Sequence, residues 1–169
     1  MRGKDKGFTL IELAVVIAIL GVMIALVAPR FADLGEANLK RSARHLTGMI
    51  RFLRDEAQAK KTVFRLKFDI QAGTYWVEAL ALNEEDKTAE YRKVSLVIAG
   101  EGSLAGNTTF RDIAVPGHPD DPYLLFTPDG WVERALIHLR NGDDKDFTLI
   151  VKPLTGDTEL REGYVEERG

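Results

Sequence analysis

The feature that most constrains this chain is an apolar run from Phe8 to Ala28, which directly follows the charged opening MRGKDKG. About 20 apolar residues are enough to span a bilayer as a helix. The opening carries an excess of basic residues, and the positive-inside rule therefore places the N-terminus in the cytoplasm. The sequence predicts a single-pass membrane helix over residues 8–29, with the rest of the chain on the opposite side of the membrane.

One ionisable residue, Glu12, interrupts this run near its start. A carboxylate in hydrocarbon is costly and normally faces a partner, although a glutamate close to the headgroups can also reach water. A cleaved secretory signal has the same basic-then-apolar order. However, cleavage after Ala28 would put Leu26 where a small residue is required and Pro29 just beyond the cut. An uncleaved membrane anchor is the main alternative.

The motif GFTLIEL, residues 7–13, resembles the class III signal of type IV pilins and type II secretion pseudopilins. The resemblance implies that a prepilin peptidase removes the leader, residues 1–7, by cutting after Gly7, and then N-methylates the new Phe8 terminus. It also implies a partner for Glu12, namely the Phe8 ammonium of a neighbouring subunit in a filament. Such a pair would offset part of the cost of burying each charge.

Residues 30–61 continue the helical pattern beyond the apolar run. Apolar residues recur at intervals of three or four, which predicts one buried helix face. Basic residues crowd the other positions, and we expect a solvated or filament-packed face there rather than a nucleic-acid surface, because the rest of the chain beside it is acidic. Pro29 and Gly21 predict bending or local melting of the helix. The predicted buried face consists of Leu39, Ala43, Leu46, Ile50, Leu53 and Ala57.

Residues 62–169 are predicted to form a β-rich globular body. The stretch VFRLKFDI alternates apolar and polar residues, as a half-buried strand does, and a QAG turn joins it to TYWVEALAL in a hairpin. We expect an exposed loop over 83–93 and a frayed tail from residue 161, where no apolar period is present. Further strands are predicted at residues 94–98, 110–115, 123–126, 131–139 and 147–152.

A long helix followed by short strands predicts an α+β fold with the helix packed on antiparallel sheet, which is also the pilin layout. The C-terminal region resembles that of H-type minor pseudopilins, the GspH/FimT group. The resemblance rests on a Phe-x-Pro-x-Gly turn at Phe126, Pro128 and Gly130, a hairpin, and a Thr-Gly turn at Thr155 and Gly156.

The sequence gives no indication of catalysis or of a cofactor. It contains no cysteine, no nucleophile or phosphate-binding motif, and three widely spaced histidines without metal-ligand spacing. The loop aspartates between residues 120 and 146 lack the oxygen spacing of an EF-hand, and turn formation explains them better than calcium binding. We therefore expect neither an enzyme nor a metal site.

Two classes of function fit these observations. The first is a minor pseudopilin that helps to initiate or cap the periplasmic pseudopilus of a type II secretion system, with other pseudopilins and the prepilin peptidase as partners. The second is a type IV pilus minor pilin that acts in pilus assembly or in DNA or ligand uptake.

The charge of the body bears on the choice of partner. Residues 62–169 contain twelve basic and twenty acidic residues, and this excess of negative charge disfavours nucleic acid as a partner. An anchored sensor domain is a more distant possibility. The expected location is the bacterial inner membrane, with the body in the periplasm.

Overall fold

The computed structural model describes residues 8–83, 87–96 and 100–166, and the side chains of residues 27–34 lie outside this description. The chain divides into two compact units, Met1–Leu34 and Gly35–Gly169, and each is considered by itself. Helix α1 spans Leu10–Lys60, and every later element in the described part of the chain is a strand. The strands are β1 (Phe64–Asp69), β2 (Thr74–Leu82), β3 (Ala89–Val94), β4 (Gly102–Ser103), β5 (Thr109–Ala114), β6 (Tyr123–Phe126), β7 (Ala135–Arg140), β8 (Asp146–Val151) and β9 (Thr158–Glu162).

Helix α1 is continuous over 51 residues, including the positions of Gly21 and Pro29. The local melting that the sequence predicts at these two residues is therefore wrong. The helix ends in a Schellman motif: Lys61 adopts the left-handed conformation (φ 53°), and the Thr62 amide donates a hydrogen bond to the Ala57 carbonyl at 3.3 Å.

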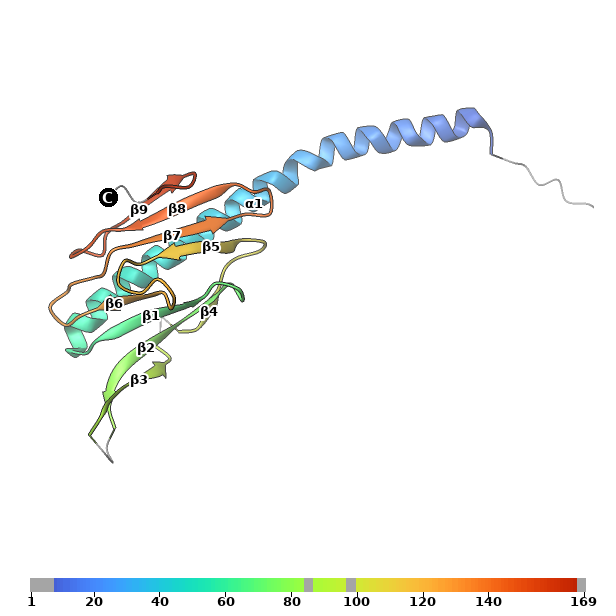
Figure 1. The fold of residues 1–169 in the computed structure, drawn as a ribbon. Coiled ribbons are helices and arrows are strands. Elements are labelled where there is room, and N and C mark those ends of the chain that lie inside the picture. The colour runs from blue at the N-terminus through green and yellow to red at the C-terminus, as the bar shows by residue number, and fades with distance from the viewer. Residues whose placement is uncertain (1–7, 84–86, 97–99, 167–169) are drawn as a thin grey trace, which may run out of the picture. The chain divides into compact units, whose positions relative to one another are not determined.

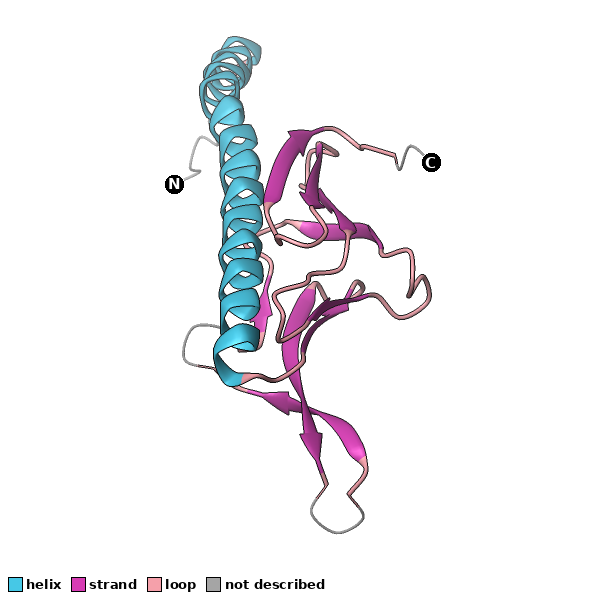
Figure 2. Cartoon of the chain, turned by 90° about the vertical axis from the view of Figure 1, so that its left-hand side faces the viewer, coloured by secondary structure: helices cyan, strands magenta, loops and turns pink. Residues whose placement is uncertain are grey.

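The body contains two antiparallel sheets (Figure 1). Sheet A has the strand order β3-β2-β1-β6, with the short β4 paired to β2, and sheet B has the order β5-β7-β8-β9. The chain crosses between the sheets repeatedly, because β5 belongs to sheet B, β6 to sheet A and β7 to sheet B again. The C-terminal half of α1 runs along one side of both sheets (Figure 2).

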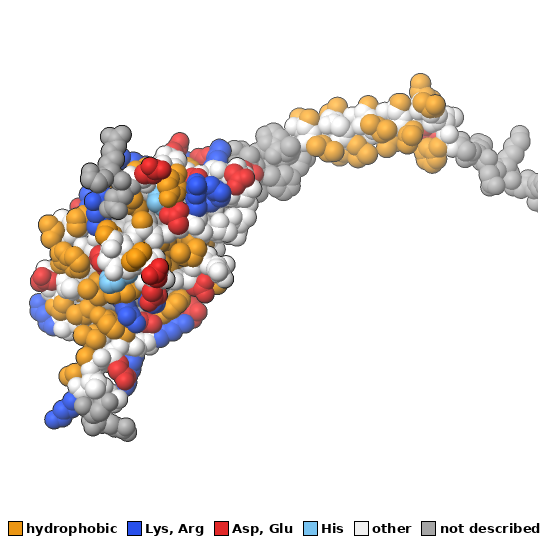
Figure 3. All heavy atoms as spheres, in the orientation of Figure 1, with side chains coloured by type: hydrophobic (Ala, Val, Ile, Leu, Met, Phe, Trp, Pro, Cys, Tyr) orange, Lys and Arg blue, Asp and Glu red, His pale blue; other side chains and the backbone are white. Residues whose placement is uncertain are grey.

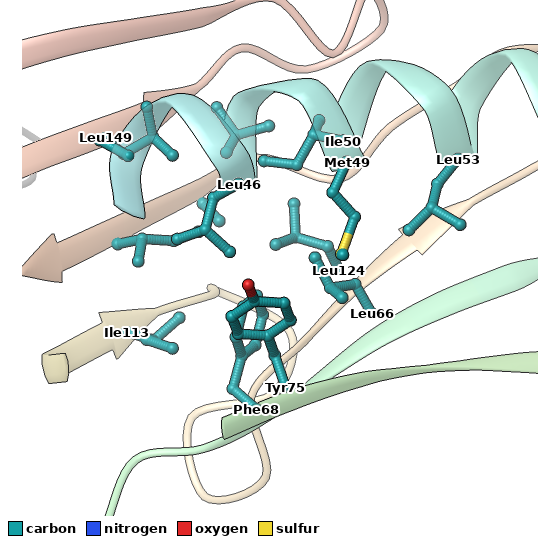
Figure 4. Close-up of a cluster of buried hydrophobic side chains, with 14 of the residues drawn as sticks. Leu46, Met49, Ile50, Leu53, Leu66, Phe68, Tyr75, Ile113, Leu124 and Leu149 are labelled. Atoms are coloured by element: carbon teal, nitrogen blue, oxygen red, sulfur yellow. The ribbon is translucent and has the colours of Figure 1, made fainter. Parts of the chain in front are cut away.

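The hydrophobic core lies between this half of α1 and the sheets. All six residues of the predicted apolar helix face are at most 1% exposed, which confirms that prediction. Leu46, Ile50 and Leu53 belong to one buried cluster with Leu66 on β1 and Leu124 on β6 (Figure 4). Burying such side chains contributes about 1.5–3 kcal/mol each, so this face fixes the helix on the body.

The α+β class and the strands at 64–69, 74–82, 109–114, 123–126 and 146–151 agree closely with the predictions. Three expectations were wrong. Part of the expected loop 83–93 is strand β3, the strand expected over 131–139 begins only at Ala135, and part of the expected frayed tail pairs with β8 as β9. Of the strand expected at 94–98, residue 94 ends β3, and residues 97 and 98 lie outside the described residues.

Candidate assembly surface on the N-terminal helix

The start of α1 is fixed by Thr9. Its hydroxyl oxygen accepts a hydrogen bond from the Glu12 amide at 3.3 Å, and its carbonyl accepts from the same amide at 3.1 Å. Thr9 is thus the N-cap, and the spacing of Thr9 and Glu12 is that of a capping box. The Glu12 carboxylate also lies in the first turn, where the helix dipole favours negative charge. The capping role was readable from the Thr-x-x-Glu spacing and was missed in the sequence interpretation.

Apart from Glu12, the first part of the helix, residues 10–26, is apolar on all sides. The large apolar side chains of residues 10–26 are 43–87% exposed, and they cover the visible surface of this part of the helix (Figure 3). A helix that is apolar all round is stable only when other apolar groups cover it. We call this surface, residues 10–26, the apolar helix surface. It comprises Leu10, Ile11, Leu13, Val15, Val16, Ile17, Ile19, Leu20, Val22, Met23, Ile24 and Leu26 with the smaller residues between them.

Glu12 is the only ionisable residue between Phe8 and Leu26. The structure shows no ion pair between its carboxylate and another described residue. Phe8 precedes the helix and is 80% exposed, whereas Gly7 lies outside the described residues. The processing and pairing roles that the resemblance assigns to Gly7, Phe8 and Glu12 therefore stay predictions.

The predicted span over residues 8–29 also stays a prediction. No helix in the described part of the chain combines the length and the apolar character needed to cross a bilayer.

Three basic residues in the second half of α1 pair with carboxylates, namely Lys40, Arg54 and Lys60. Lys40 binds Glu36 at 2.6 Å, and Lys145 approaches the other carboxylate oxygen of Glu36 at 3.3 Å. These two ammonium groups hold the pKa of Glu36 below its ordinary value, with the hydrogen bond from Lys40 as the main cause. Arg54 binds Asp55 and the carbonyl of Thr155. These basic residues therefore belong to networks of ion pairs and hydrogen bonds on the surface of the folded body.

The loop aspartates are dispersed among separate partners. Asp146 binds Arg140 at 2.8 Å and also Arg111, and the hydrogen bond from Arg140 lowers the pKa of Asp146. Asp121 pairs with Lys67, while Asp129 accepts a hydrogen bond from the Thr127 hydroxyl. Among the described residues, no group of three His or acidic side chains is placed to hold a metal ion.

The two turns of the C-terminal region lie where the sequence predicts them. Gly130, the last residue of the Phe-x-Pro-x-Gly motif, adopts φ +89°, and its amide donates a hydrogen bond to the Thr127 carbonyl. Gly156 adopts φ +64° in the turn that joins β8 to β9. Glycine adopts such positive φ values without steric cost because it has no Cβ atom.

Comparisons with known proteins address both units. Residues 2–28 match the prokaryotic N-terminal methylation motif. The type IV narrow pilus major component PilA5 of Thermus thermophilus is 52% identical over 44 residues, which cover 24% of this chain and 38% of that protein. The chain thus aligns with little more than a third of that relative's length.

The fold is similar to that of the minor pseudopilin EpsH from the type II secretion system of Vibrio cholerae. One structure of EpsH matches with a TM-score of 0.52 at 15% identity, covering 74% of this chain and 95% of EpsH. A crystal structure of EpsH matches with a TM-score of 0.55 at 14% identity, and the match covers 79% of this chain and 98% of EpsH. The N-terminal segment thus carries the prokaryotic methylation motif, and the chain shares the pilin-like α+β fold of a minor pseudopilin. The proteins that it resembles are a pilus component and a minor pseudopilin.

Proposed function

We propose that this protein is a minor pseudopilin that helps to initiate or cap the pseudopilus of a type II secretion system. The observation that carries the proposal is the apolar helix surface, which is exposed on all sides and has a single carboxylate at its start. Before assembly the inner membrane would cover this surface, and in the filament the helices of other pseudopilins would replace the lipid. The likeness of the body to EpsH and its two C-terminal turns support an H-type subunit.

Processing would occur at the junction between Gly7 and Phe8. The helix begins at Leu10, so removal of residues 1–7 by the prepilin peptidase would leave it intact. The cut would create an ammonium group, the site of N-methylation, at Phe8, which is exposed next to the first helical turn. The body would then lie in the periplasm on a single-pass anchor.

The Glu12 carboxylate would meet the Phe8 ammonium of a neighbouring subunit during assembly. An unpaired charge in hydrocarbon costs several kcal/mol, so a subunit that joins without this pair would be strongly disfavoured. The Glu12→Leu variant should therefore insert and be cleaved normally, yet fail to cross-link to other pseudopilins. N-terminal mass spectrometry and cross-linking on the same membrane preparation measure both properties.

The capping contact at the start of α1 supplies a matched control for this experiment. Thr9→Ala removes the N-cap hydroxyl, which costs about 1 kcal/mol of helix stability, and leaves the Glu12 charge in place. Under the proposal, Thr9→Ala cross-links almost as well as the unaltered chain. An equal loss of cross-linking in both variants would show that Glu12 acts through helix capping, and normal cross-linking by Glu12→Leu would refute the pairing role.

The second candidate function is that of a type IV pilus minor pilin. The match to the pilus component PilA5 favours it, because that match is the one with high sequence identity. Deleting the gene and measuring secreted enzyme activity beside surface piliation distinguishes the two functions. Loss of secretion with intact pili supports the pseudopilin, and the reverse result supports the pilin.

A further inference from the structure

The last described residues, 163–166, form a strap across the outer face of sheet B. The strap is tied to β8 by three hydrogen bonds. The Gly163 amide donates to the Asp146 carbonyl at 2.8 Å, the Thr148 hydroxyl donates to the Gly163 carbonyl at 2.8 Å, and the Val165 amide donates to the Thr148 hydroxyl oxygen at 3.0 Å. The segment is therefore docked on the sheet.

Under the strap lies His138 of β7, which is 1% exposed in the folded body. Its Nδ1 lies 2.6 Å from a carboxylate oxygen of Asp112, and its Nε2 lies 3.0 Å from the carbonyl oxygen of Val165. The ring also stacks on Tyr164, with centroids 4.0 Å apart and planes inclined by 19°. Both ring nitrogens thus face oxygen atoms that accept hydrogen bonds.

A neutral imidazole carries one N–H and one lone pair, whereas an imidazolium carries two N–H donors. With a neutral ring, one nitrogen lone pair would point at either the carboxylate or the carbonyl. We propose that docking of the C-terminal strap is coupled to a proton on His138, so that the imidazolium holds the strap and the neutral ring releases it. The neutral ring keeps its N–H toward Asp112, and its hydrogen bond to the Val165 carbonyl is broken.

The charged groups around the ring support this assignment. Asp112 on β5 is the carboxylate in contact with His138, and it also lies 3.5 Å from the Tyr164 hydroxyl. The carboxylate of Asp146 on β8 is already bound by two guanidinium groups. The other charged groups of the surrounding elements are Arg111 on β5, whose guanidinium lies 4.3 Å from the Tyr164 ring centroid, Arg140 on β7 and Glu166 on the strap. Strand β9 carries Glu159 and Arg161, which pair with each other, and Glu162.

Release of the strap would change a groove beside it. This groove, of about 550 Å³, has Leu136 and Ile150 in its lining, and Val165 of the strap also lines it. Its remaining lining residues are charged: Arg134, Lys152, Glu159, Arg161 and Glu166. Because the strap contributes to the lining, its departure opens the groove and uncovers His138. The proton on one ring thus controls access to this part of sheet B.

The test uses the full chain in detergent micelles and follows the hydrogen-exchange protection factor of the Val165 amide. When the pH is raised from about 5.5 to about 8.5, the protection of the Val165 amide should fall about tenfold, as expected for the loss of one hydrogen bond. The ¹⁵N signals of the His138 side chain should show two N–H groups while the strap is docked. The Leu139 amide, in the same strand, serves as the reference for global unfolding.

His138→Gln should abolish the pH dependence, because an amide does not titrate. His118→Gln is the matched control. The His118 ring also stacks on a tyrosine, Tyr123, with ring centroids 3.9 Å apart, and its Nε2 lies 3.4 Å from a carboxylate oxygen of Glu133, but His118 does not line the groove beside the strap. This control should keep the tenfold change. A single N–H on His138 in the docked state, or unchanged pH dependence in His138→Gln, would overturn the proposal. If the Leu139 amide of His138→Gln also loses protection, the variant is globally destabilised. The ¹⁵N signals of His138 in the unaltered chain then test the proposal: two N–H groups in the docked state support it, and one overturns it.

Discussion

Truncation of Leu46 tests whether the second half of α1 is held by its apolar face. Leu46 is fully buried and points between the strands toward Tyr75 and Phe68 (Figure 4). Leu46→Ala removes the equivalent of about three methylene groups, a transfer loss of about 2.4 kcal/mol. The cavity left behind adds to this loss, and we expect the free energy of unfolding to fall by about 3–4 kcal/mol. That is a large part of the 5–15 kcal/mol typical of a folded domain.

Urea unfolding of a fragment spanning residues 35–169 measures this change, because every residue of the hydrophobic core lies within it. The midpoint should drop while the slope of free energy against urea stays constant, since the surface exposed on unfolding is nearly the same. Arg51→Ala, on the exposed side of the same helix, is the control and should change stability by less than about 0.5 kcal/mol. A loss below about 1 kcal/mol for Leu46→Ala, or equal losses for both variants, would refute the packing argument.

Two further predictions concern charge and backbone conformation. The pKa of Asp146 is lowered, chiefly by the hydrogen bond from Arg140, so the stability that this carboxylate contributes is present above its ordinary pKa and is lost as the pH falls through the lowered value. The free energy of unfolding of Asp146→Asn should therefore be lower at neutral pH by about 1–3 kcal/mol. Below about pH 4 it should depend less on pH than that of the unaltered chain. Gly156→Ala should cost about 1–3 kcal/mol, because φ is +64° and the added Cβ would lie 2.9 Å from Val132. Gly73→Ala, with φ +66° but open space around it, should cost less, and equal thermal shifts would contradict the steric part of this argument.

Much of the fold could be predicted from the sequence because its signals are local. The three-and-four spacing of the helix face and the alternation of β1 each reflect one buried side of a regular element. Strand β3 has no such signal, since Glu90, Arg92 and Lys93 are exposed on it and only Tyr91 and Val94 are partly buried. Charged side chains are typical of edge strands, where they prevent further pairing, and they made this strand look like a loop.

The C-terminal region shows why polar docking is hard to predict. The tail after Glu162 has no apolar period, and it is held by hydrogen bonds to Thr148 and His138, two polar residues far from it in the sequence. Nothing in the local sequence indicates those hydrogen bonds. By contrast, the Thr9 cap was predictable, since the Thr-x-x-Glu spacing is a known helix-start signal.

The interleaved order of the strands has a kinetic consequence. The β1-β2-β3 and β7-β8-β9 meanders each join neighbours in the sequence and can form early from local interactions. Neither sheet is complete, however, until the segment from β5 to β6 has contributed one strand to each. Because that segment belongs to both sheets, they should form in one cooperative step, and stopped-flow refolding of the body should give a single exponential phase.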